Sequence, residues 1–359
     1  MNKFADIAKK SVMNIRPYVP GKPIEEVQRE HGIKDVVKLA SNENPLGPSK
    51  LAIKAMEKKL KSVNFYPESG AFYLRGALAK HLKVKENMIV FGNGSNEILT
   101  LIAEAFVSPG DEVMFSAMSF VVYPIAVNTV GGISIQIPHN NFKHDMDGFI
   151  KRLSPKTKLV YICNPNNPTG SIINKEELER FLSAVSPKTI VALDEAYFEY
   201  VQDKHYPDGI KFLAKHPNLI VLRTFSKIYG LAGIRIGYAV ADPDIIEIIE
   251  RVRPPFNANM LAQAAGQAAL KDKEHVKKTF KTNTEGKKYL CGEFKKMNIE
   301  FVQPHANFIF VKFKSNSKVI FQALLKHGII IRPQFDSYAR ITIGTMEENK
   351  KLIRALKAI

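Results

Sequence analysis

Cysteine is scarce in this sequence, and features of secretion are missing. The 359 residues include two cysteines, Cys163 and Cys291, which allow no disulfide framework and lack the spacing of a metal site. We therefore expect a reducing compartment and no bound metal. The first residues lack the apolar core that a secretion signal needs, which predicts a cytoplasmic protein. No internal repeat or low-complexity tract is present.

Long apolar runs are missing as well. The stretch from Val113 to Pro138 carries no charged residue, but Pro124, Asn128 and two glycines interrupt it. A membrane span would need about 20 uninterrupted apolar residues. This stretch instead predicts a strand, a helix and a second strand in a buried sheet, so no membrane partner is expected.

Acidic residues are also in short supply. The chain has 35 Asp and Glu against 52 Lys and Arg, and its formal net charge is +17. A nucleic-acid-binding surface would add clusters of arginine and aromatic residues. Here the lysines are spread over helix-like stretches such as 50–61 and 271–288, which is typical of solvated helix faces. We expect no nucleic-acid partner, although a positive field favours an anionic metabolite.

What the sequence does contain is a regular alternation of short apolar runs and helix-length segments. This alternation runs from residue 46 to residue 255 and predicts an α/β domain with a mostly parallel central sheet flanked by helices. The predicted strands are 88–91, 112–115, 133–137, 159–162, 190–193, 219–222 and 236–240.

Prolines mark both ends of this large domain. Residues 1–45 contain Pro17, Pro20 and Pro23 and predict an extended N-terminal arm that packs with a smaller domain. Residues 253–257 (RPPFN) contain two more prolines and mark the end of the large domain. The segment 256–359 predicts that smaller α+β domain, with a long helix from 261 to 296 and strands at 308–311, 329–331 and 340–343.

Two motifs follow predicted strands. Residues 92–97 (GNGSNE) open a helix, and their glycines and exposed amides suit a phosphate, although Ser95 as a plain helix cap is an alternative. Residues 164–170 (NPNNPTG) form a turn made rigid by two prolines. An asparagine side chain in that turn can donate a hydrogen bond to an aromatic oxygen.

A third group of residues provides, in sequence order, an acid, a lysine and an arginine. Asp194 ends an apolar strand, where a buried carboxylate needs a cation such as a protonated pyridine nitrogen; a helix cap is the alternative. Thr224, Ser226 and Arg235 suit a dianionic phosphate. Lys227 lies among them and can bond to an aldehyde. This ordered set is what a pyridoxal-phosphate enzyme requires.

These motifs resemble the fold-type I pyridoxal-phosphate aminotransferases, and most closely the histidinol-phosphate aminotransferase family. The resemblance covers nearly the whole chain, from residues 39–48 (LASNENPLGP) to Arg340. It implies a homodimer that exchanges an amino group between L-histidinol phosphate and 2-oxoglutarate, giving imidazole-acetol phosphate and L-glutamate, in histidine biosynthesis. Its partners would be small phosphorylated amines and 2-oxo acids.

The resemblance also implies roles for single residues. Lys227 would bond to the cofactor and move a proton, Asp194 would contact the ring nitrogen, and Asn167 and Tyr197 would contact the ring oxygen. The remaining cofactor contacts would come from Gly94, Ser95, Asn96, Phe120, Thr224, Ser226 and Arg235. The chain departs from the usual family pattern at Met118-Ser119, before Phe120, and at Asn96, where an acid is common.

Substrate contacts are implied in the same way. Arg340 would hold the anionic tail of the substrate, with Arg332 as a second cation and Asn42 nearby. Tyr18 would close over the substrate from the arm, unless the arm packs only for stability. Tyr66 would reach the cofactor of the partner subunit, or else be an aromatic residue of a surface turn.

Three other functions remain open from the sequence. An aromatic amino-acid aminotransferase is the main alternative, because the same arginine could hold the carboxylate of phenylalanine. A related lyase that decarboxylates phosphothreonine is a second. A basic nucleic-acid-binding protein with a vestigial site is a third.

Overall fold

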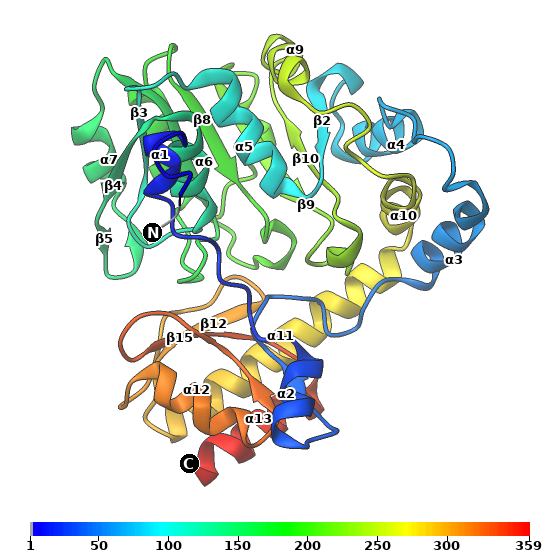
Figure 1. Ribbon diagram of the computed structural model, residues 1–359, viewed down its shortest axis with the longest axis vertical. Helices are drawn as coiled ribbons and strands as arrows, with labels where there is room; N and C mark the ends of the chain where they lie inside the picture. The colour runs from blue at the N-terminus through cyan, green and yellow to red at the C-terminus, as the bar shows by residue number, and fades with distance from the viewer. Residues whose placement is uncertain (1–2) are drawn as a thin grey trace.

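A seven-stranded sheet forms the centre of the upper lobe in Figure 1. The computed structural model of the chain describes residues 3–359. The strand order is β2-β10-β9-β8-β7-β3-β4, and all neighbours are parallel except β10, which runs opposite to β9 and β2. The predicted mostly parallel sheet is thus confirmed. Its strands are β2 (Ile89–Gly92), β3 (Glu112–Ser116), β4 (Ile133–Ile137), β7 (Thr157–Cys163), β8 (Ile190–Asp194), β9 (Leu219–Thr224) and β10 (Gly237–Val240).

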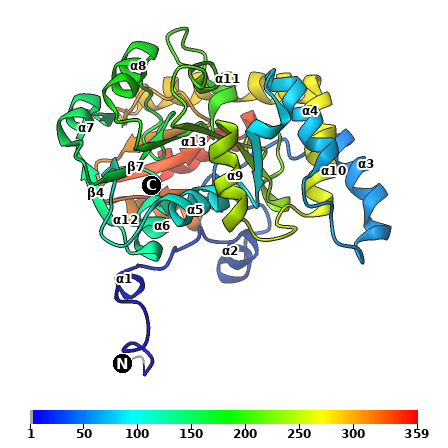
Figure 2. The ribbon, with the colours of Figure 1, turned by 90° about the horizontal axis from the view of Figure 1, so that it is seen from above.

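Helices cover both faces of this sheet, which explains why its strands are almost entirely apolar. Successive residues of a strand point to opposite faces. Leu159 and Ile220 join one buried cluster, while their neighbours Val160 and Val221 join the other. Figure 2 shows α7 and α8 on one side of the strands and α5, α6 and α9 on the other. The covering helices are α4 (Phe72–Leu82), α5 (Ser95–Phe106), α6 (Val122–Val130), α7 (Met146–Arg152), α8 (Lys175–Ala184), α9 (Pro243–Val252) and α10 (Met260–Lys271).

Short elements complete the upper lobe. The hairpin of β5 and β6 follows β4, and α3 packs extensively against α10 at the outer edge of the lobe. In the part of the chain that the structure describes, no helix is long and apolar enough to cross a membrane. The bounds of the short elements are α3 (Lys50–Lys59), η1 (Leu60–Ser62), η2 (Glu86–Met88), β5 (His139–Asn140), β6 (Lys143–His144), η3 (Phe198–Tyr200), η4 (Gly209–Phe212) and η5 (Ala232–Ile234).

The lower lobe is built on a four-stranded antiparallel sheet in the order β11-β12-β15-β14. Ile309 and Ile341, on its two central strands, pack against Leu290 and Leu352 from the flanking helices in one buried cluster. Each strand therefore has one apolar face that the helices cover. The elements are α11 (Lys273–Lys296), β11 (Glu300–Phe301), β12 (Phe308–Lys312), α12 (Ser317–Leu325), β14 (Arg332–Pro333), β15 (Tyr338–Thr342) and α13 (Met346–Ala358).

The predicted single helix from 261 to 296 is wrong. Two helices occupy this range, and α10 ends at Lys271 before α11 begins at Lys273. Asp272 leaves the helical conformation, and its side chain accepts a hydrogen bond from the backbone N–H of His275. Aspartate favours this capping position because its short side chain satisfies a free N–H at the helix start.

The N-terminal arm is less extended than predicted. Helix α2 (Ile24–His31) ends in a left-handed Gly32, and the buried Val27 packs with Leu325 and Ile330 of the lower lobe. Strand β1 (Val37–Lys38) pairs in parallel with β13 (Ile329–Ile330), so the predicted strand at 329–331 joins the arm. The segment with α1 (Lys10–Met13) reaches α6 of the upper lobe (Figures 1 and 2). Met1 and Asn2 of the predicted arm lie outside the described residues.

The sheet directions bring the chemically important segments to one edge. Strands β2, β3, β7, β8 and β9 all end at this edge. Because β10 runs the opposite way, its amino end also lies there, and Arg235 precedes it. Ligands of open α/β sheets bind outside the carboxyl ends of the strands.

Candidate active site

A cavity of about 570 Å³ lies at this edge, between the two lobes. Its walls come from the ends of β7, β8 and β9, from the start of α5, from the arm and from β15. Most residues predicted for the site line this one cavity, namely Tyr18, Asn42, Ser95, Asn96, Phe120, Asn167, Asp194, Tyr197, Thr224, Ser226, Lys227, Arg235 and Arg340.

Lys227 follows β9 and points into the cavity. Its Nζ donates a hydrogen bond to the carbonyl oxygen of Ser41 at 3.3 Å and lies 5.7 Å from the ring centre of Tyr197. Burial, together with the positive charge of Arg340, lowers the pKa of Lys227 to about 8. A lysine with this pKa is partly neutral near pH 7.5, and only the neutral amine can attack an aldehyde.

Asp194 is a buried carboxylate without a cation beside it. The hydroxyl of Tyr123 donates to Oδ2 at 3.0 Å, and the backbone N–H of Ala196 donates to Oδ1 at 3.2 Å. Within residues 3–359 it forms no ion pair, and burial raises the pKa of its carboxyl to about 6. The alternative role as a helix cap is excluded, because a turn and not a helix follows β8. A cationic ring nitrogen would complete its surroundings.

Hydroxyls and an arginine form a cradle for an anion at the start of α5. The Thr224 hydroxyl donates to Ser226 Oγ at 3.0 Å, and Arg235 Nη1 lies 3.5 Å from the same oxygen. The free N–H groups of the first turn of α5 border this cradle, and Ser95 and Asn96 line the cavity. Such an arrangement binds a dianionic phosphate.

Gly94 makes this cradle compact. It occupies the cap position of α5 with φ of 78°, and Ser95 is the first helical residue, so the alternative of Ser95 as a plain helix cap is wrong. A Cβ atom on Gly94 would lie 2.2 Å from Nη2 of Arg235. Only glycine therefore permits both this backbone conformation and the approach of the arginine.

Arg340 joins the small sheet to the cavity. Its Nη1 donates to Asn167 Oδ1 at 2.5 Å and its Nη2 to the carbonyl oxygen of Ala40 at 2.7 Å. Its Nε, although buried, has no partner in the described part of the chain. Burial lowers the pKa of this guanidinium, and the group has no carboxylate partner among the described residues. A cation in this state is suited to binding an anionic ligand.

Asn42 connects the arm to both lobes. Its side-chain nitrogen donates to the hydroxyl oxygen of Tyr197 at 2.9 Å, and its Oδ1 accepts from the Thr342 hydroxyl at 3.1 Å. Burial raises the pKa of Tyr197, so its hydroxyl stays protonated. That hydroxyl and the Asn167 amide both line the cavity, and both can donate to an oxygen on an aromatic ring.

Three predicted residues do not line the cavity. Gly94 lies behind it, as described above. Tyr66 is 81% exposed and stacks on Phe256 at 4.7 Å. Arg332 donates to the carbonyl oxygen of Val19 and lies 5.6 Å from the ring centre of Tyr18, so it contacts the arm. The roles of Tyr66 and Arg332 stay predictions.

Sequence reasoning missed the residues that support the predicted ones. Tyr123 is the clearest case, since it holds Asp194 and makes an edge contact with Phe120 at 5.9 Å. It lies three residues after Phe120, near the start of α6, and this closeness in sequence is the signal that could have indicated it. Ser41 and Glu43 also line the cavity, and both belong to the motif at 39–48.

The residues present fit pyridoxal phosphate. A phosphate suits the cradle of Thr224, Ser226 and Arg235, a protonated ring nitrogen suits Asp194, and an aldehyde suits the amine of Lys227. The fit rests above all on Asp194, a buried acid that lacks a cation.

The comparisons with known proteins agree with one another. The family described as aminotransferase class I and II matches residues 34–356. A histidinol-phosphate aminotransferase of Moorella thermoacetica is 48% identical, over 98% of this chain and 92% of that protein. One of Caldicellulosiruptor saccharolyticus is 46% identical, over 97% and 98%. A crystal structure of histidinol-phosphate aminotransferase from Sinorhizobium meliloti, in complex with pyridoxal-5'-phosphate, has a TM-score of 0.91 and 28% identity, over 98% of this chain and 96% of that one.

Proposed function

The chain belongs to the class I and II aminotransferases, and we propose that it exchanges an amino group between L-histidinol phosphate and 2-oxoglutarate with pyridoxal phosphate as its cofactor. The reaction is a step of histidine biosynthesis. In the biosynthetic direction, imidazole-acetol phosphate and L-glutamate give L-histidinol phosphate and 2-oxoglutarate. One observation carries the proposal: a buried acid without a cation, a lysine of lowered pKa and an anion cradle line one cavity. The relatives described above do not favour an aromatic amino-acid aminotransferase.

When bound, pyridoxal phosphate supplies an aldehyde that takes up the amino group and a protonated ring that draws electrons from the reacting carbon. Asp194 would keep the proton on the ring nitrogen, because a buried carboxylate stabilises a cationic partner. Asn167 and Tyr197 would donate to the ring oxygen, and Phe120, which lines the same cavity, would pack on the ring. Thr224, Ser226 and Arg235 bind the phosphate through two hydroxyls and a guanidinium.

Lys227 holds the cofactor and then moves a proton. Its Nζ would take the proton from the substrate carbon that bears the amino group and would carry it to the cofactor. A pKa of about 8 suits both tasks, because the amine accepts a proton readily near neutral pH and also releases it. Ser41, whose carbonyl accepts from Nζ, keeps the amine directed into the cavity.

Arg340 orients the substrate through its anionic group. For histidinol phosphate this group is the phosphate, and for 2-oxoglutarate it is a carboxylate. The guanidinium, which lines the cavity, binds either one by charge-assisted hydrogen bonds. Asn42, Tyr18 and Arg332 complete the substrate side, with Tyr18 reaching in from the arm.

The proposal extends to the assembly of the protein. Tyr66, exposed and outside its own cavity, reaches the cofactor of the second subunit in a cytoplasmic homodimer. Two-fold dimers are the commonest soluble oligomers. Each subunit comprises an arm (1–45), a large cofactor-binding domain (46–255) and a small domain (256–359).

A half-reaction without acceptor tests this function. The cofactor-loaded protein is mixed separately with L-histidinol phosphate and with L-phenylalanine, and the visible band of the cofactor is followed. We expect rapid loss of the band with histidinol phosphate and at least about 100-fold slower loss with phenylalanine, because its carboxylate offers Arg340 a smaller charge and fewer acceptor oxygens than a dianionic phosphate does. A preference for phenylalanine would overturn the substrate assignment and leave the cofactor chemistry intact.

A further inference from the structure

Glu43 is an acid of the active-site cavity that the reaction described above does not use. Among the described residues that line this cavity, the carboxylates are those of Asp194 and Glu43. Asp194 is buried and is assigned to the ring nitrogen, whereas the side chain of Glu43 is 41% exposed. Glu43 lies two residues after Ser41, whose carbonyl oxygen accepts a hydrogen bond from Lys227. A ligand in the cavity can therefore reach the carboxylate of Glu43.

The carboxylate of Glu43 has one oxygen available for a ligand. Lys38 Nζ donates to its Oε1 at 2.7 Å, while its Oε2 accepts no hydrogen bond from residues 3–359. The negative charge also acts within the cavity, because it opposes the lowering of the pKa of Lys227 and of Arg340 that burial causes. Glu43 is thus an open, charged acceptor beside the groups that bind the cofactor and the substrate.

The proposed substrate has one polar group that still lacks a partner. In L-histidinol phosphate the carbon that bears the amine also carries a phosphate arm and an imidazole arm. The amine is assigned to Lys227 and the phosphate to Arg340. A neutral imidazole has one N–H, and a donor that leaves water needs an acceptor in the protein. A carboxylate forms a charge-assisted hydrogen bond, which is stronger than a bond to a neutral oxygen.

Other acceptors in the cavity are already engaged. Asn167 Oδ1 accepts from Arg340 at 2.5 Å, and Asn42 Oδ1 accepts from the Thr342 hydroxyl at 3.1 Å. The hydroxyl oxygen of Tyr197 accepts from the Asn42 amide at 2.9 Å. The hydroxyls of the phosphate cradle are assigned to the cofactor. Glu43, in contrast, combines an open oxygen with a full negative charge.

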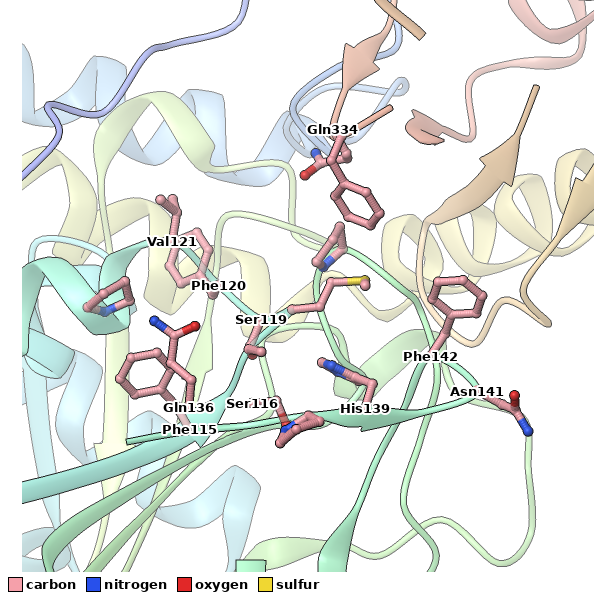
Figure 3. Close-up of a pocket in the computed structure, with 16 residues that line it drawn as sticks. Phe115, Ser116, Ser119, Phe120, Val121, Gln136, His139, Asn141, Phe142 and Gln334 are labelled. Atoms are coloured by element: carbon pink, nitrogen blue, oxygen red, sulfur yellow. The ribbon is translucent and has the colours of Figure 1, made fainter. Parts of the chain in front are cut away.

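A larger cavity next to the active site offers no such partner. It has a volume of about 860 Å³ and meets the active site at Phe120, which lines both cavities. Figure 3 shows His139 and Phe142 on one side of it and Phe120 and Val121 on the other. None of the described residues that line it is an aspartate or a glutamate. An imidazole N–H in that cavity would meet no carboxylate, so the charged acceptor favours the side of Glu43.

We propose that Glu43 accepts a hydrogen bond from the imidazole N–H of L-histidinol phosphate and is a specificity-determining residue for this substrate. Lys38 binds Oε1 and leaves Oε2 to the ring. Tyr18, which also belongs to the arm and lines the cavity, provides an aromatic face for the ring. L-Glutamate has no such N–H, and its side-chain carboxylate would be repelled by Glu43. This inference rests on the function proposed above.

Half-reactions of cofactor-loaded variants test the inference. The amino donors are L-histidinol phosphate and 2-aminopropyl phosphate, which has the same amine and phosphate but no ring. The ratio of kcat/KM for the two donors isolates the ring, because effects on Lys227 or Arg340 act on both donors. In Glu43→Met this ratio should fall about 30-fold, since the N–H loses a charged acceptor. In Glu43→Gln, which keeps a neutral acceptor, it should fall about fivefold.

Lys38→Met is the matched control, because it removes the same ion pair but keeps the carboxylate, and the ratio should change less than about threefold. An equal fall in Lys38→Met and Glu43→Met would overturn the inference, since the ion pair would then only hold the arm. An unchanged ratio in Glu43→Met would overturn it as well. With L-glutamate, kcat/KM of Glu43→Met should not fall, and a loss as large as with histidinol phosphate would contradict a role in selecting the substrate. Wild-type protein that fails to convert histidinol phosphate would overturn the proposed function itself, a result that needs no variant.

Discussion

Two consecutive carboxylates at the end of β8, both buried, have opposite surroundings. Glu195 accepts from Arg223 Nε at 2.9 Å and Nη2 at 2.7 Å, and from the backbone N–H of Gly209 at 2.9 Å. Asp194, on the other face of the sheet, has a tyrosine hydroxyl and one backbone N–H but no cation. The sequence places the two acids side by side, and the strand pleat sends them to different environments.

Around Glu195 the charges neutralise one another. Arg223 Nη2 also donates to Asp208 at 2.6 Å, and its guanidinium lies 3.4 Å from the ring centre of Phe198. Burial raises the pKa of Glu195 to about 7 and opposes the charge of Arg223, but each charge stabilises the other, and the neighbouring carboxylates raise the pKa of Arg223 above the ordinary value. We refer to Glu195, Arg223 and Asp208 as the ion-pair cluster. The charges of this cluster are paired with one another, so they need no ligand.

Around Asp194 the charges are left uncompensated. Asp194, Lys227 and Arg340, which we refer to as the site cluster, form no ion pair among the described residues, and burial shifts the pKa of each group toward its neutral form. Such groups cost stability and are retained where a ligand completes them. The comparison teaches that burial alone does not mark a functional acid, whereas burial without a counter-ion does.

The largest effect is expected from removing the amine of the site cluster. Lys227→Ala should slow the half-reaction about 1,000-fold or more, because no other group can move the proton, and should not destabilise the apoprotein. Stopped-flow absorbance and urea unfolding measure the two quantities. The exposed Lys326→Ala serves as control. Turnover within tenfold of the wild type would contradict the role of Lys227 in moving the proton.

The ion-pair cluster should respond in the opposite way. Arg223→Met leaves Glu195 and Asp208 buried without a cation and should lower the free energy of unfolding by about 3–5 kcal/mol. The turnover of the folded fraction should stay within a few-fold. Arg251→Met, which breaks an exposed pair with Glu247, should cost less than about 1 kcal/mol. If urea unfolding shows an equally small loss in the free energy of unfolding for both variants, the ion-pair cluster does not stabilise the fold.

Arg340 tests the substrate side of the site cluster. Arg340→Gln should raise KM for histidinol phosphate about 30-fold, which corresponds to about 2 kcal/mol for a lost charge-assisted contact. Arg340→Lys should lie between this value and the wild type, because lysine keeps the charge but not the forked geometry. Steady-state kinetics measure both. An unchanged KM in Arg340→Gln would place the phosphate elsewhere.

The smallest expected effect is a shift in pH dependence. Since only neutral Lys227 attacks the cofactor aldehyde, the rate of cofactor capture by the apoprotein should rise with pH and level off above a midpoint near 8. Arg340→Gln should move the midpoint upward, because a positive neighbour is removed. Absorbance after mixing apoprotein with cofactor measures the rate. A midpoint near 10.5, the ordinary lysine value, would contradict the lowered pKa.

Much of this picture could be predicted from the sequence. The strands were recognisable because both faces of the sheet are buried, and Lys227 and Asn167 were recognisable because they follow strands. The helix break at Asp272 was missed, since a single aspartate within a lysine-rich helical pattern carries little information. The cap of α5 was assigned correctly only once the positive φ of Gly94 was known.

The rest depends on contacts between distant segments. Tyr123 is 71 residues from Asp194, and Arg223 is 28 residues from Glu195. Neither pairing has a local pattern, so the sequence could not show that Glu195 is paired with an arginine and that Asp194 forms no ion pair.

The comparison of the two acids is tested most directly by neutralising each in turn. The folded pKa of Asp194, about 6, lies above its ordinary value of 3.8, so its ionisation costs stability that accumulates between about pH 4 and pH 6 and persists above. At pH 8, Asp194→Asn should therefore leave the apoprotein as stable as the wild type, or more stable by up to about 3 kcal/mol.

The same variant should bind pyridoxal phosphate about 100-fold more weakly, because the ring nitrogen loses its counter-ion. Glu195→Gln should show the reverse, with a loss of about 3 kcal/mol in urea unfolding and unchanged cofactor affinity. Urea unfolding of the apoproteins and cofactor titration decide between these outcomes. An Asp194→Asn apoprotein as unstable as Glu195→Gln, with cofactor affinity intact, would contradict the account.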